Sequence, residues 1–326
     1  MKKNIAIVAG GDSAESVISL QSAKQISENI DTEKFNAFTI CVKGSEWILK
    51  RDNNNDIIID KDDFSFSINN EKTTFDCVFM AIHGTPGENG ILQAYFDILK
   101  IPYTTSNQLT SALTFNKFVC NTYLKGFDIL MAKSFFLRKN DEINPEKIIK
   151  KVGLPCFVKP NNGGSSFGIS KVYEEKDVVG AVNKAFDEDD EIIIEEFIEG
   201  TEISCGLLKT NKKEYIFPIT EIVSENDFFD YEAKYTNGMA QEISPARISK
   251  NIEEQCKQLS MEIYKFLNCK GIVRIDYIIN NNQLYFLEIN TVPGMSENSI
   301  VPKQIRTMRL SISDIFTEVL EDALSR

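Results

Sequence analysis

The chain has 326 residues, 42 % of them hydrophobic, and its 48 acidic and 36 basic side chains give a formal net charge of −12. This length predicts two or three domains with sizeable cores, and the acidic balance argues against nucleic acid or an anionic membrane as the main partner. No apolar run approaches the roughly 18 residues of a membrane span, and the apolar run at residues 5–9 is shorter than a signal peptide needs, so we expect a cytoplasmic protein.

The N-terminal third reads as an α/β unit, in which strands and helices alternate along the chain. Residues 4–9 form a continuous apolar run, as is typical of a buried parallel strand. It ends in Gly10-Gly11-Asp12-Ser13, a turn that opens a helix. The further elements expected here are a helix at 14–29, strands at 37–42, 77–82 and 101–104, and a helix at 90–99. We therefore predict an N-terminal open parallel α/β domain over residues 1–105.

Two more domains are expected, at 106–196 and 197–326. The central domain should contain helices at 107–125, at 145–151 and from 177, and strands at 133–138, 156–159, 169–173 and 191–196. The C-terminal domain should be mixed, with strands at 202–208, 214–223, 272–279 and 284–290, and helices at 249–268 and 311–325. Each predicted strand is a short apolar or alternating run, and each helix has apolar residues at helical spacing.

The clearest chemical signal lies in the last two predicted strands. Glu288 and Asn290 are two positions apart in a strand-like run, so they should point to one face of the sheet. Asp276 lies in the preceding strand, and a hairpin through the turn at 280–282 would bring all three onto one surface. These side chains offer oxygen ligands only, as magnesium prefers when it is held beside ATP phosphates. The alternative is a set of solvated acids on a sheet edge.

A Gly/Ser-rich loop at residues 160–168 follows Lys159. Glycines let the backbone approach a phosphate closely, and consecutive N–H groups can form an anion-binding nest. Lys159 would add a positive charge at the entrance. The loop matches neither a Walker A motif nor the Gly-x-Gly-x-x-Gly fingerprint, so an ordinary surface hairpin remains an equal alternative.

Four weaker signals each have an ordinary structural explanation. The acidic segment after the strand at 191–196 could bind an adenine edge, or could be a solvated strand end. The polar loop at 224–245 could close over a phosphate, or could be an exposed loop without function. His83, the only histidine, follows a strand end where ligands gather, but lone histidines are more often structural. Glu15, at the start of a predicted helix, could do no more than interact favourably with the positive end of the helix dipole.

Together these segments resemble the D-alanine–D-alanine ligase family of the ATP-grasp superfamily, over nearly the whole chain. The residues that carry the resemblance are 10–20, 83–90, 111–117, 159–168, 195, 230–235, 245–246, 274–276 and 288–302. The chain departs from the family pattern at Ser16, Gly163, Glu196 and Asn89, where arginine, glutamate, lysine and aspartate respectively are common. The first three departures remove or reverse charge around the nucleotide.

The resemblance implies a three-domain ATP-grasp fold and the ATP-dependent joining of two D-alanine molecules through a D-alanyl phosphate, for peptidoglycan precursors. It also implies ATP and two Mg²⁺ ions as cofactors, Mn²⁺ as a substitute, small-molecule substrates and a homodimer. The alternatives within the superfamily are a D-alanine–D-serine or D-alanine–D-lactate ligase, or another carboxylate–amine ligase. A dehydrogenase is disfavoured because the first Gly-rich turn lacks a third glycine, and a non-catalytic nucleotide-binding subunit is disfavoured by the metal ligands.

The resemblance further implies a role for each site residue. The catalytic residues would be Glu15, Ser165, Lys234, Tyr235, Arg274 and Gly294, of which Arg274 and the Gly294 amide would stabilise the oxyanion. The substrate would be bound by His83, Ser299 and Ile300. ATP would be bound by Lys117, Lys159, Ser166, Phe167, Gly168, Glu195, Phe197, Ile198 and Glu202. The metal ligands would be Asp276, Glu288 and Asn290.

Overall fold

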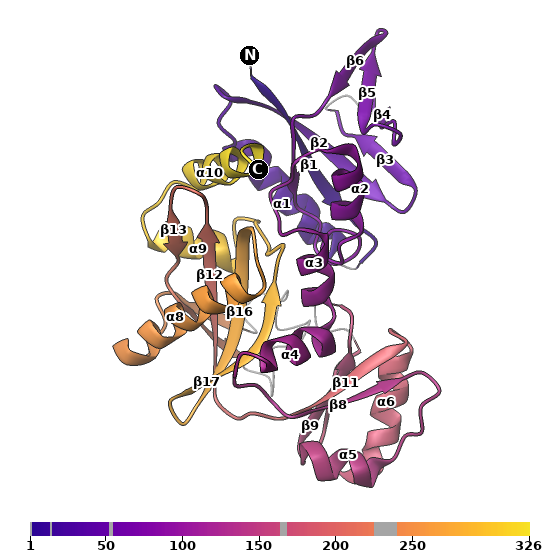
Figure 1. The fold of residues 1–326 in the computed structure, drawn as a ribbon, viewed down its shortest axis with the longest axis vertical. Helices are drawn as coiled ribbons and strands as arrows, with labels where there is room; N and C mark the ends of the chain where they lie inside the picture. The colour runs from indigo at the N-terminus through magenta and orange to yellow at the C-terminus, as the bar shows by residue number, and fades with distance from the viewer. Residues whose placement is uncertain (1, 14, 52–54, 164–167, 225–239) are drawn as a thin grey trace.

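A computed structural model describes residues 2–13, 15–51, 55–163, 168–224 and 240–326. This described part contains sheets of five, four and six strands and a separate two-stranded sheet. Figure 1 shows the three larger sheets spread along the long axis of the molecule, with the N-terminal sheet at the top and the four-stranded sheet at the bottom. The six-stranded sheet lies between them. The mixed α/β class predicted from the sequence is confirmed.

The N-terminal sheet has the strand order β4-β3-β2-β1-β7. Its strands are β1 (Lys3–Gly10), β2 (Phe35–Lys43), β3 (Glu46–Leu49), β4 (Ile57–Ile58) and β7 (Cys77–Met80). Strand β1 pairs in parallel with β2 and β7, as predicted, but β3 and β4 add antiparallel strands at one edge. The sheet is therefore mixed, because the two-residue turn Gly44-Ser45 folds β3 back onto β2 as a hairpin.

Smaller elements complete the N-terminal region. Helices α1 (Ser16–Asn29) and α2 (Ile91–Leu99) accompany the sheet, and β5 (Ser65–Ile68) pairs with β6 (Glu71–Thr74). The turn between β5 and β6 is Asn69-Asn70, with φ of 52° and 67°, which suits a hairpin of two left-handed residues. The strand predicted at 101–104 reduces to a single bridge between Tyr103 and Val78.

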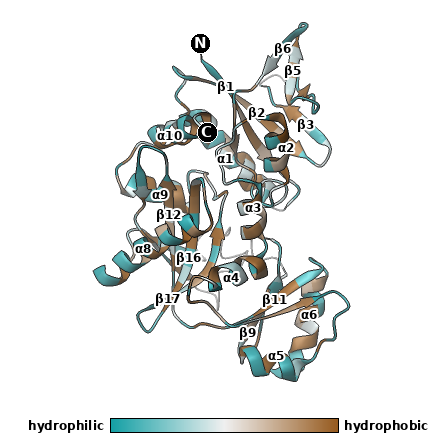
Figure 2. Ribbon diagram, in the orientation of Figure 1, coloured by the Kyte–Doolittle hydropathy of each residue, from teal (hydrophilic) through white to brown (hydrophobic). Residues whose placement is uncertain are grey.

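The central sheet has the order β10-β9-β11-β8 and is antiparallel throughout. Its strands are β8 (Ser134–Arg138), β9 (Cys156–Pro160), β10 (Ser170–Val172) and β11 (Glu191–Glu196). Helices α5 (Pro145–Val152) and α6 (Val178–Phe186), with the short 3₁₀ helix η1 (Glu175–Asp177), pack against it. Helix α5 buries Ile148 and Val152 and exposes its lysines, and Figure 2 shows it in both hydrophobic and hydrophilic colours.

The single helix predicted at 107–125 is in fact two helices, α3 (Gln108–Phe115) and α4 (Lys117–Lys125). The chain is extended at Asn116, with φ −86° and ψ 104°, and its Oδ1 accepts a hydrogen bond from the Val119 N–H at 2.9 Å. Asparagine side chains favour such N-cap positions because they satisfy backbone donors that have no partner within the helix. The break turns α4 toward the central sheet.

The C-terminal sheet has the path β15-β14-β12-β16-β17, and β13 pairs with β12. Its strands are β12 (Thr201–Lys209), β13 (Glu214–Ile216), β14 (Thr220–Ser224), β15 (Ala240–Ile243), β16 (Gly271–Asn280) and β17 (Gln283–Asn290). The helices are α8 (Lys250–Phe266), α9 (Ile300–Thr307) and α10 (Ile312–Leu324). The strand predicted at 214–223 is divided into β13 and β14 around Pro218, which has no N–H for a sheet ladder.

One hydrophobic core joins the two ends of the chain. Residues of β1, α1 and β7 share it with residues of β12, β16, α9 and α10. Phe79 of β7 packs edge-on against Phe316 of α10, with ring centroids 5.3 Å apart. Figure 1 shows α10, in yellow, beside the indigo N-terminal strands. The three domains predicted at 1–105, 106–196 and 197–326 remain a prediction, and this shared core crosses from the first to the third.

Candidate active site

The β16–β17 hairpin gathers the predicted metal ligands on one face. Asp276 lies directly opposite Glu288, and Arg274 lies directly opposite Asn290. Because alternate residues of a strand share a face, these four side chains belong to one surface of the sheet. The expected hairpin arrangement of Asp276, Glu288 and Asn290 is therefore present, with Arg274 added to it.

The Asp276 carboxylate is buried and fully engaged with neighbouring donors. The Arg274 guanidinium donates to both of its oxygens, at 2.7 Å from Nη2 to Oδ2 and 3.0 Å from Nε to Oδ1. Ser204 Oγ donates to Oδ1 at 2.6 Å, and Asn290 Nδ2 donates to Oδ2 at 3.2 Å. Burial lowers the pKa of Arg274, but Asp276 and then Glu288 more than offset it, so the guanidinium stays charged.

The donor set of this surface fits a hard cation. Asp276, Glu288 and Asn290 offer carboxylate and amide oxygens, and the Asn290 amide already turns its nitrogen toward Asp276, which leaves its oxygen on the other side. Within the described part of the chain, no group of three or more His, Cys, Asp or Glu is arranged to hold a metal. A metal here would thus depend on the amide of Asn290 and on oxygens of the nucleotide.

Lys159 faces this hairpin from the central sheet. Its Nζ forms a buried ion pair with Glu195 Oε2 at 2.5 Å, and Asn121 Nδ2 donates to the other carboxylate oxygen at 3.0 Å. Burial lowers the pKa of Lys159, but Glu195 and Glu288 outweigh it and raise the value above 10.5. Lys159 therefore interacts with one carboxylate of the central sheet, on β11, and with one carboxylate of the C-terminal sheet, on β17.

Lys117, the first residue of α4, reaches the root of the Gly-rich loop, where its Nζ donates to the Gly163 carbonyl at 2.5 Å. Lys117 thus reaches the loop from α4, while Lys159 precedes it in β9. Gly168 ends the loop with φ +68°, and a side chain there would approach Pro160 and Glu188 too closely. Ser165, Ser166 and Phe167 lie outside the described residues, as do Lys234 and Tyr235.

The segment predicted to hold adenine follows β11. The Glu195 side chain is committed to Lys159 and Asn121, so of this residue only the backbone is left for a base. The Phe197 and Ile198 side chains are partly exposed, and Lys171 Nζ lies 3.9 Å from the centroid of the Phe197 ring. Glu202, predicted to bind ribose, is partly exposed near the start of β12.

The N-terminal region meets the hairpin at Val292. His83 Nδ1 lies 2.7 Å from the Val292 carbonyl and Nε2 lies 3.1 Å from Ser22 Oγ, while the Met295 N–H donates to Ser22 Oγ at 3.0 Å. Since a carbonyl can only accept, Nδ1 carries the proton and Ser22 donates to Nε2. Burial lowers the pKa of His83, in agreement with this neutral form.

Glu88 holds the same segment from a second side. Its two carboxylate oxygens accept from the Gly84 N–H at 2.7 Å and from the Val292 N–H at 3.2 Å. Burial, and then the charge of Glu15, raise the pKa of Glu88 to about 7. A Cβ built at Gly84 would lie 3.5 Å from Glu15 Oε2. Glu15, which was predicted to bind the ammonium group of the first D-alanine, therefore lies close to this segment.

The remaining predicted residues lie on the turn between β17 and α9. Ser299 is the residue before α9, and its Oγ is 2.7 Å from Ser296 Oγ. A Cβ at Gly294 would approach Ser299 Oγ to 2.8 Å, so the turn has no room for a side chain there. Ile300, the first residue of α9, is buried. Gly294, Ser299 and Ile300 are thus neighbours, as their predicted roles require.

The structure adds four residues for which no role was predicted: Ser22, Glu88, Asn121 and Asn161. Glu88 stands in the glycine-rich segment that carried the family resemblance, which was a usable signal. Ser22 had none, because a serine within a helix is ordinary. His83 was predicted to bind substrate, and in this structure both its ring nitrogens are engaged with Val292 and Ser22.

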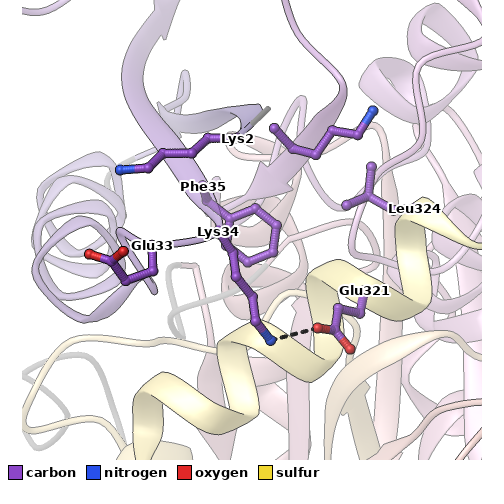
Figure 3. A pocket seen from close by; sticks show the side chains of 7 residues that line it. Lys2, Glu33, Lys34, Phe35, Glu321 and Leu324 are labelled. Carbon is purple, nitrogen blue, oxygen red and sulfur yellow. Dashed lines mark hydrogen bonds and ion pairs between the residues drawn. The ribbon is translucent and has the colours of Figure 1, made fainter.

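A surface hollow of about 560 Å³ lies elsewhere, where β1 and the turn before β2 meet α10. Figure 3 shows Lys34 beside Glu321, an ion pair of 2.8 Å across this hollow. None of the predicted site residues lines it, so it is not part of the candidate site. Among the described residues, no helix combines the length and the apolar character that crossing a membrane requires.

Comparisons with known proteins agree over the whole chain. The family described as D-ala D-ala ligase N-terminus matches residues 4–106, and D-ala D-ala ligase C-terminus matches residues 124–321. The D-alanine–D-alanine ligase of Phocaeicola vulgatus is 53 % identical over 323 residues, 99 % of each chain. That of Bacteroides fragilis is 46 % identical over 323 residues, again 99 % of each chain.

Solved structures are similar over the full length as well. The VanG D-Ala:D-Ser ligase from Enterococcus faecalis has a TM-score of 0.87 at 31 % identity, covering 98 % of this chain and 99 % of that one. The D-alanine–D-alanine ligase from Bacillus anthracis complexed with ATP has a TM-score of 0.78 at 25 % identity, covering 99 % and 97 %.

Proposed function

The chain belongs to the D-alanine–D-alanine ligase family, and from that premise we propose how its own residues carry out the reaction. It is an ATP-dependent ligase of the ATP-grasp fold that joins two D-alanine molecules into D-alanyl-D-alanine for peptidoglycan precursors. The observation that supports the proposed site best is the cross-strand pairing of Asp276 with Glu288 and of Arg274 with Asn290 on one face.

ATP is proposed to lie between the central sheet and the β16–β17 hairpin. Lys117 and Lys159 would contact its phosphates. The Lys117 ammonium group lies at the root of the Gly-rich loop, and the Lys159 ammonium group lies beside the carboxylates of Glu195 and Glu288. The backbone of residues 195–198 would bind adenine, and Glu202 would bind the ribose hydroxyls. A relative of the same fold has been solved in complex with ATP, which supports this choice of nucleotide.

Asp276, Glu288 and Asn290 are proposed to hold two Mg²⁺ ions beside the ATP phosphates, and Mn²⁺ could replace them. When bound, the ions would neutralise charge on the phosphates during phosphoryl transfer. Asp276 would then exchange one of its present bonds, from Arg274 or from Asn290, for the metal.

The reaction has two bond-forming steps. The carboxylate of the first D-alanine attacks the γ-phosphorus and ADP leaves, giving a D-alanyl phosphate. The amine of the second D-alanine then attacks that carbonyl carbon, and phosphate leaves. Arg274 and the Gly294 N–H are proposed to stabilise the negative charge that develops on the carbonyl oxygen. Loss of one such donor typically costs about 2.7–4 kcal/mol of transition-state stabilisation.

Substrate orientation would come from both ends of the site. Glu15 is proposed to bind the ammonium group of the first D-alanine, with Ser165 and Tyr235 linked to it. Ser299 and the amide of Ile300, at the start of α9, would bind the carboxylate of the second D-alanine, since helix N-termini favour anions. His83 would not touch the substrate itself. It would act by holding the segment at Val292 in place. Lys234, together with Ser166, Phe167 and Gly168, would close around the phosphates.

The test is phosphate release from Mg-ATP with each D- and L-amino acid, followed by mass analysis of the product. D-alanine alone should release phosphate and give the dipeptide. Ester-forming ligases often carry a histidine where Tyr235 stands, so adding D-lactate should yield no predominant ester near pH 6 or pH 8. A D-serine arm tests the alternative acceptor, because one added hydroxyl is poorly rejected by a small pocket. Phosphate release without D-alanine dependence would refute the assignment.

A cytoplasmic location and a homodimer are also proposed. ATP as substrate supports the first, and the family resemblance supports the second. Light scattering on the purified enzyme measures the mass of the particle directly. A particle of the monomer mass of 36.9 kDa at working concentration would contradict the dimer.

A further inference from the structure

Asn161, in the loop that the sequence analysis singled out, uses every polar atom it has, although no role was predicted for it. It is fully buried directly after β9, two positions beyond Lys159. Its N–H donates to the Glu191 carbonyl at 2.9 Å, and its Nδ2 donates to Glu191 Oε2 at 3.0 Å. Its carbonyl and Oδ1 both accept hydrogen bonds from the first turn of α4. One side chain thus connects β9, β11 and α4.

The bonds to α4 complete the cap of that helix. The Lys117 N–H donates to the Asn161 carbonyl at 3.1 Å, and the Phe118 N–H donates to Asn161 Oδ1 at 2.8 Å. Asn116 Oδ1 accepts the Val119 N–H at 2.9 Å, and the Asn116 N–H itself donates to the Ala112 carbonyl at 3.4 Å. The four donors that a helix leaves unpaired at its start are all satisfied here. The helix therefore offers phosphate only the Lys117 side chain.

A single carboxylate oxygen ties the two capping asparagines together. Glu191 Oε2 accepts from Asn161 Nδ2 at 3.0 Å and from Asn116 Nδ2 at 3.1 Å. Its other oxygen accepts from Arg138 Nε at 3.2 Å. Glu191 begins β11, the strand that carries Glu195, the ion-pair partner of Lys159. The elements that carry Lys117, Lys159 and Glu195 therefore meet at Asn161.

We propose that Asn161 is a positioning residue that fixes Lys117 and Lys159 relative to each other, so that both ammonium groups meet the phosphates of one bound ATP. The inference rests on the proposed function, because it takes both lysines as ATP ligands. Asn161 would not touch the nucleotide. Its loss would let α4 shift against β9, which weakens binding of ATP and ADP and leaves D-alanine binding unaffected.

The experiment compares Asn161→Ala and Asn161→Ser with the wild type by steady-state kinetics and by calorimetric titration of Mg-ADP. We expect the KM for ATP and the Kd for Mg-ADP to rise about tenfold in Asn161→Ala, a loss of roughly 1.4 kcal/mol of binding free energy. Asn161→Ser should give a smaller rise. The KM for D-alanine should stay at the wild-type value in both. Glu191→Gln tests the same link from its other end and should raise the Kd for Mg-ADP.

The matched control is Asn144→Ala, which removes another asparagine cap from the same region. Asn144 Oδ1 accepts from the Lys147 N–H at 3.0 Å at the start of α5, away from Lys117 and Lys159. It should lower Tm without changing either nucleotide constant. The proposal is overturned if the Asn161 and Glu191 variants lower Tm as the control does and leave the Kd for Mg-ADP unchanged. A wild type that fails to bind Mg-ADP would instead refute the proposed function.

Discussion

The β16–β17 hairpin and the contact around Val292 both lie near Arg274, yet the chain builds them in opposite ways. In the hairpin, Asn290 reaches Asp276 across 14 positions of sequence and one tight turn. At the contact, His83 and Glu88 hold Val292 from 209 and 204 positions away. The first region brings charged side chains together on a sheet face. The second uses side chains to hold backbone groups.

This difference separates chemistry from alignment. A change in the hairpin alters the charge available to the phosphates while the fold keeps the position of each atom. A change at Val292 leaves those charges in place but moves the turn that carries Gly294 against the N-terminal residues that include Glu15. The first kind of change should therefore reduce turnover, and the second should act on D-alanine.

The largest expected effect breaks the hairpin. Glu288→Gln keeps the volume of the side chain but removes a charge next to Lys159 and Arg274. Loss of a metal ligand removes several kcal/mol of transition-state stabilisation, so kcat should fall more than about 100-fold. The measurement is phosphate release at saturating Mg-ATP, with Tm recorded in parallel.

The control for Glu288→Gln is Glu254→Gln, an equal charge change on the exposed side of α8. It should leave both kcat and Tm unchanged. Turnover at the wild-type rate in Glu288→Gln, or in the presence of excess chelator, would mean that the hairpin holds no essential cation.

A smaller effect sharpens the other half of the comparison. Ser22→Ala should leave the Met295 N–H and His83 Nε2 buried without partners, at a cost of about 1–3 kcal/mol. We expect Tm to fall by several degrees and kcat/KM for D-alanine to fall about tenfold. The KM for ATP should not change.

Ser27→Ala, on the exposed side of the same helix, is the matched control and should behave as wild type. If Ser22→Ala raised the KM for ATP as much as that for D-alanine, the contact at Val292 would not act selectively on the D-alanine end of the site.

The smallest effect is a pH dependence at Glu88. Its pKa is about 7 against an ordinary 4.5, because of burial and the charge of Glu15, while Arg274 acts in the opposite sense. Since the folded-state pKa is raised, the contribution of Glu88 to stability is complete below pH 4.5 and is lost as the pH rises to about 7.

Glu88→Gln removes this titration. The Tm of the variant minus that of the wild type should therefore rise between about pH 5 and pH 8, whatever its offset from the lost hydrogen bond to Gly84 or Val292. A thermal-shift series at constant ionic strength measures it. A difference that is flat or falls with pH would contradict the raised pKa. His83 is present in both the variant and the wild type, so its own titration cancels from this difference.

Sequence predicted what depends on short-range order. The alternation in β17 and the turn after β16 were sufficient to put Asp276, Glu288 and Asn290 on one face. The break at Asn116 was missed because the apolar pattern of the predicted helix continues through it. Asn161, which accepts the Phe118 N–H and so stabilises the break, lies 43 positions further along the chain. The family resemblance identified Glu15 and His83 as site residues. It did not reveal that the His83 ring hydrogen-bonds to the backbone carbonyl of Val292.

Helix α10 is synthesised long after β7, yet its Phe316 completes the packing around Phe79 of that strand. At synthesis rates of roughly 5–20 residues per second, that face of the N-terminal sheet waits on the order of ten seconds or more for its cover. During this interval the nascent chain exposes apolar surface that chaperones recognise. A chain that lacks α10 would keep that surface exposed, and such a surface favours aggregation.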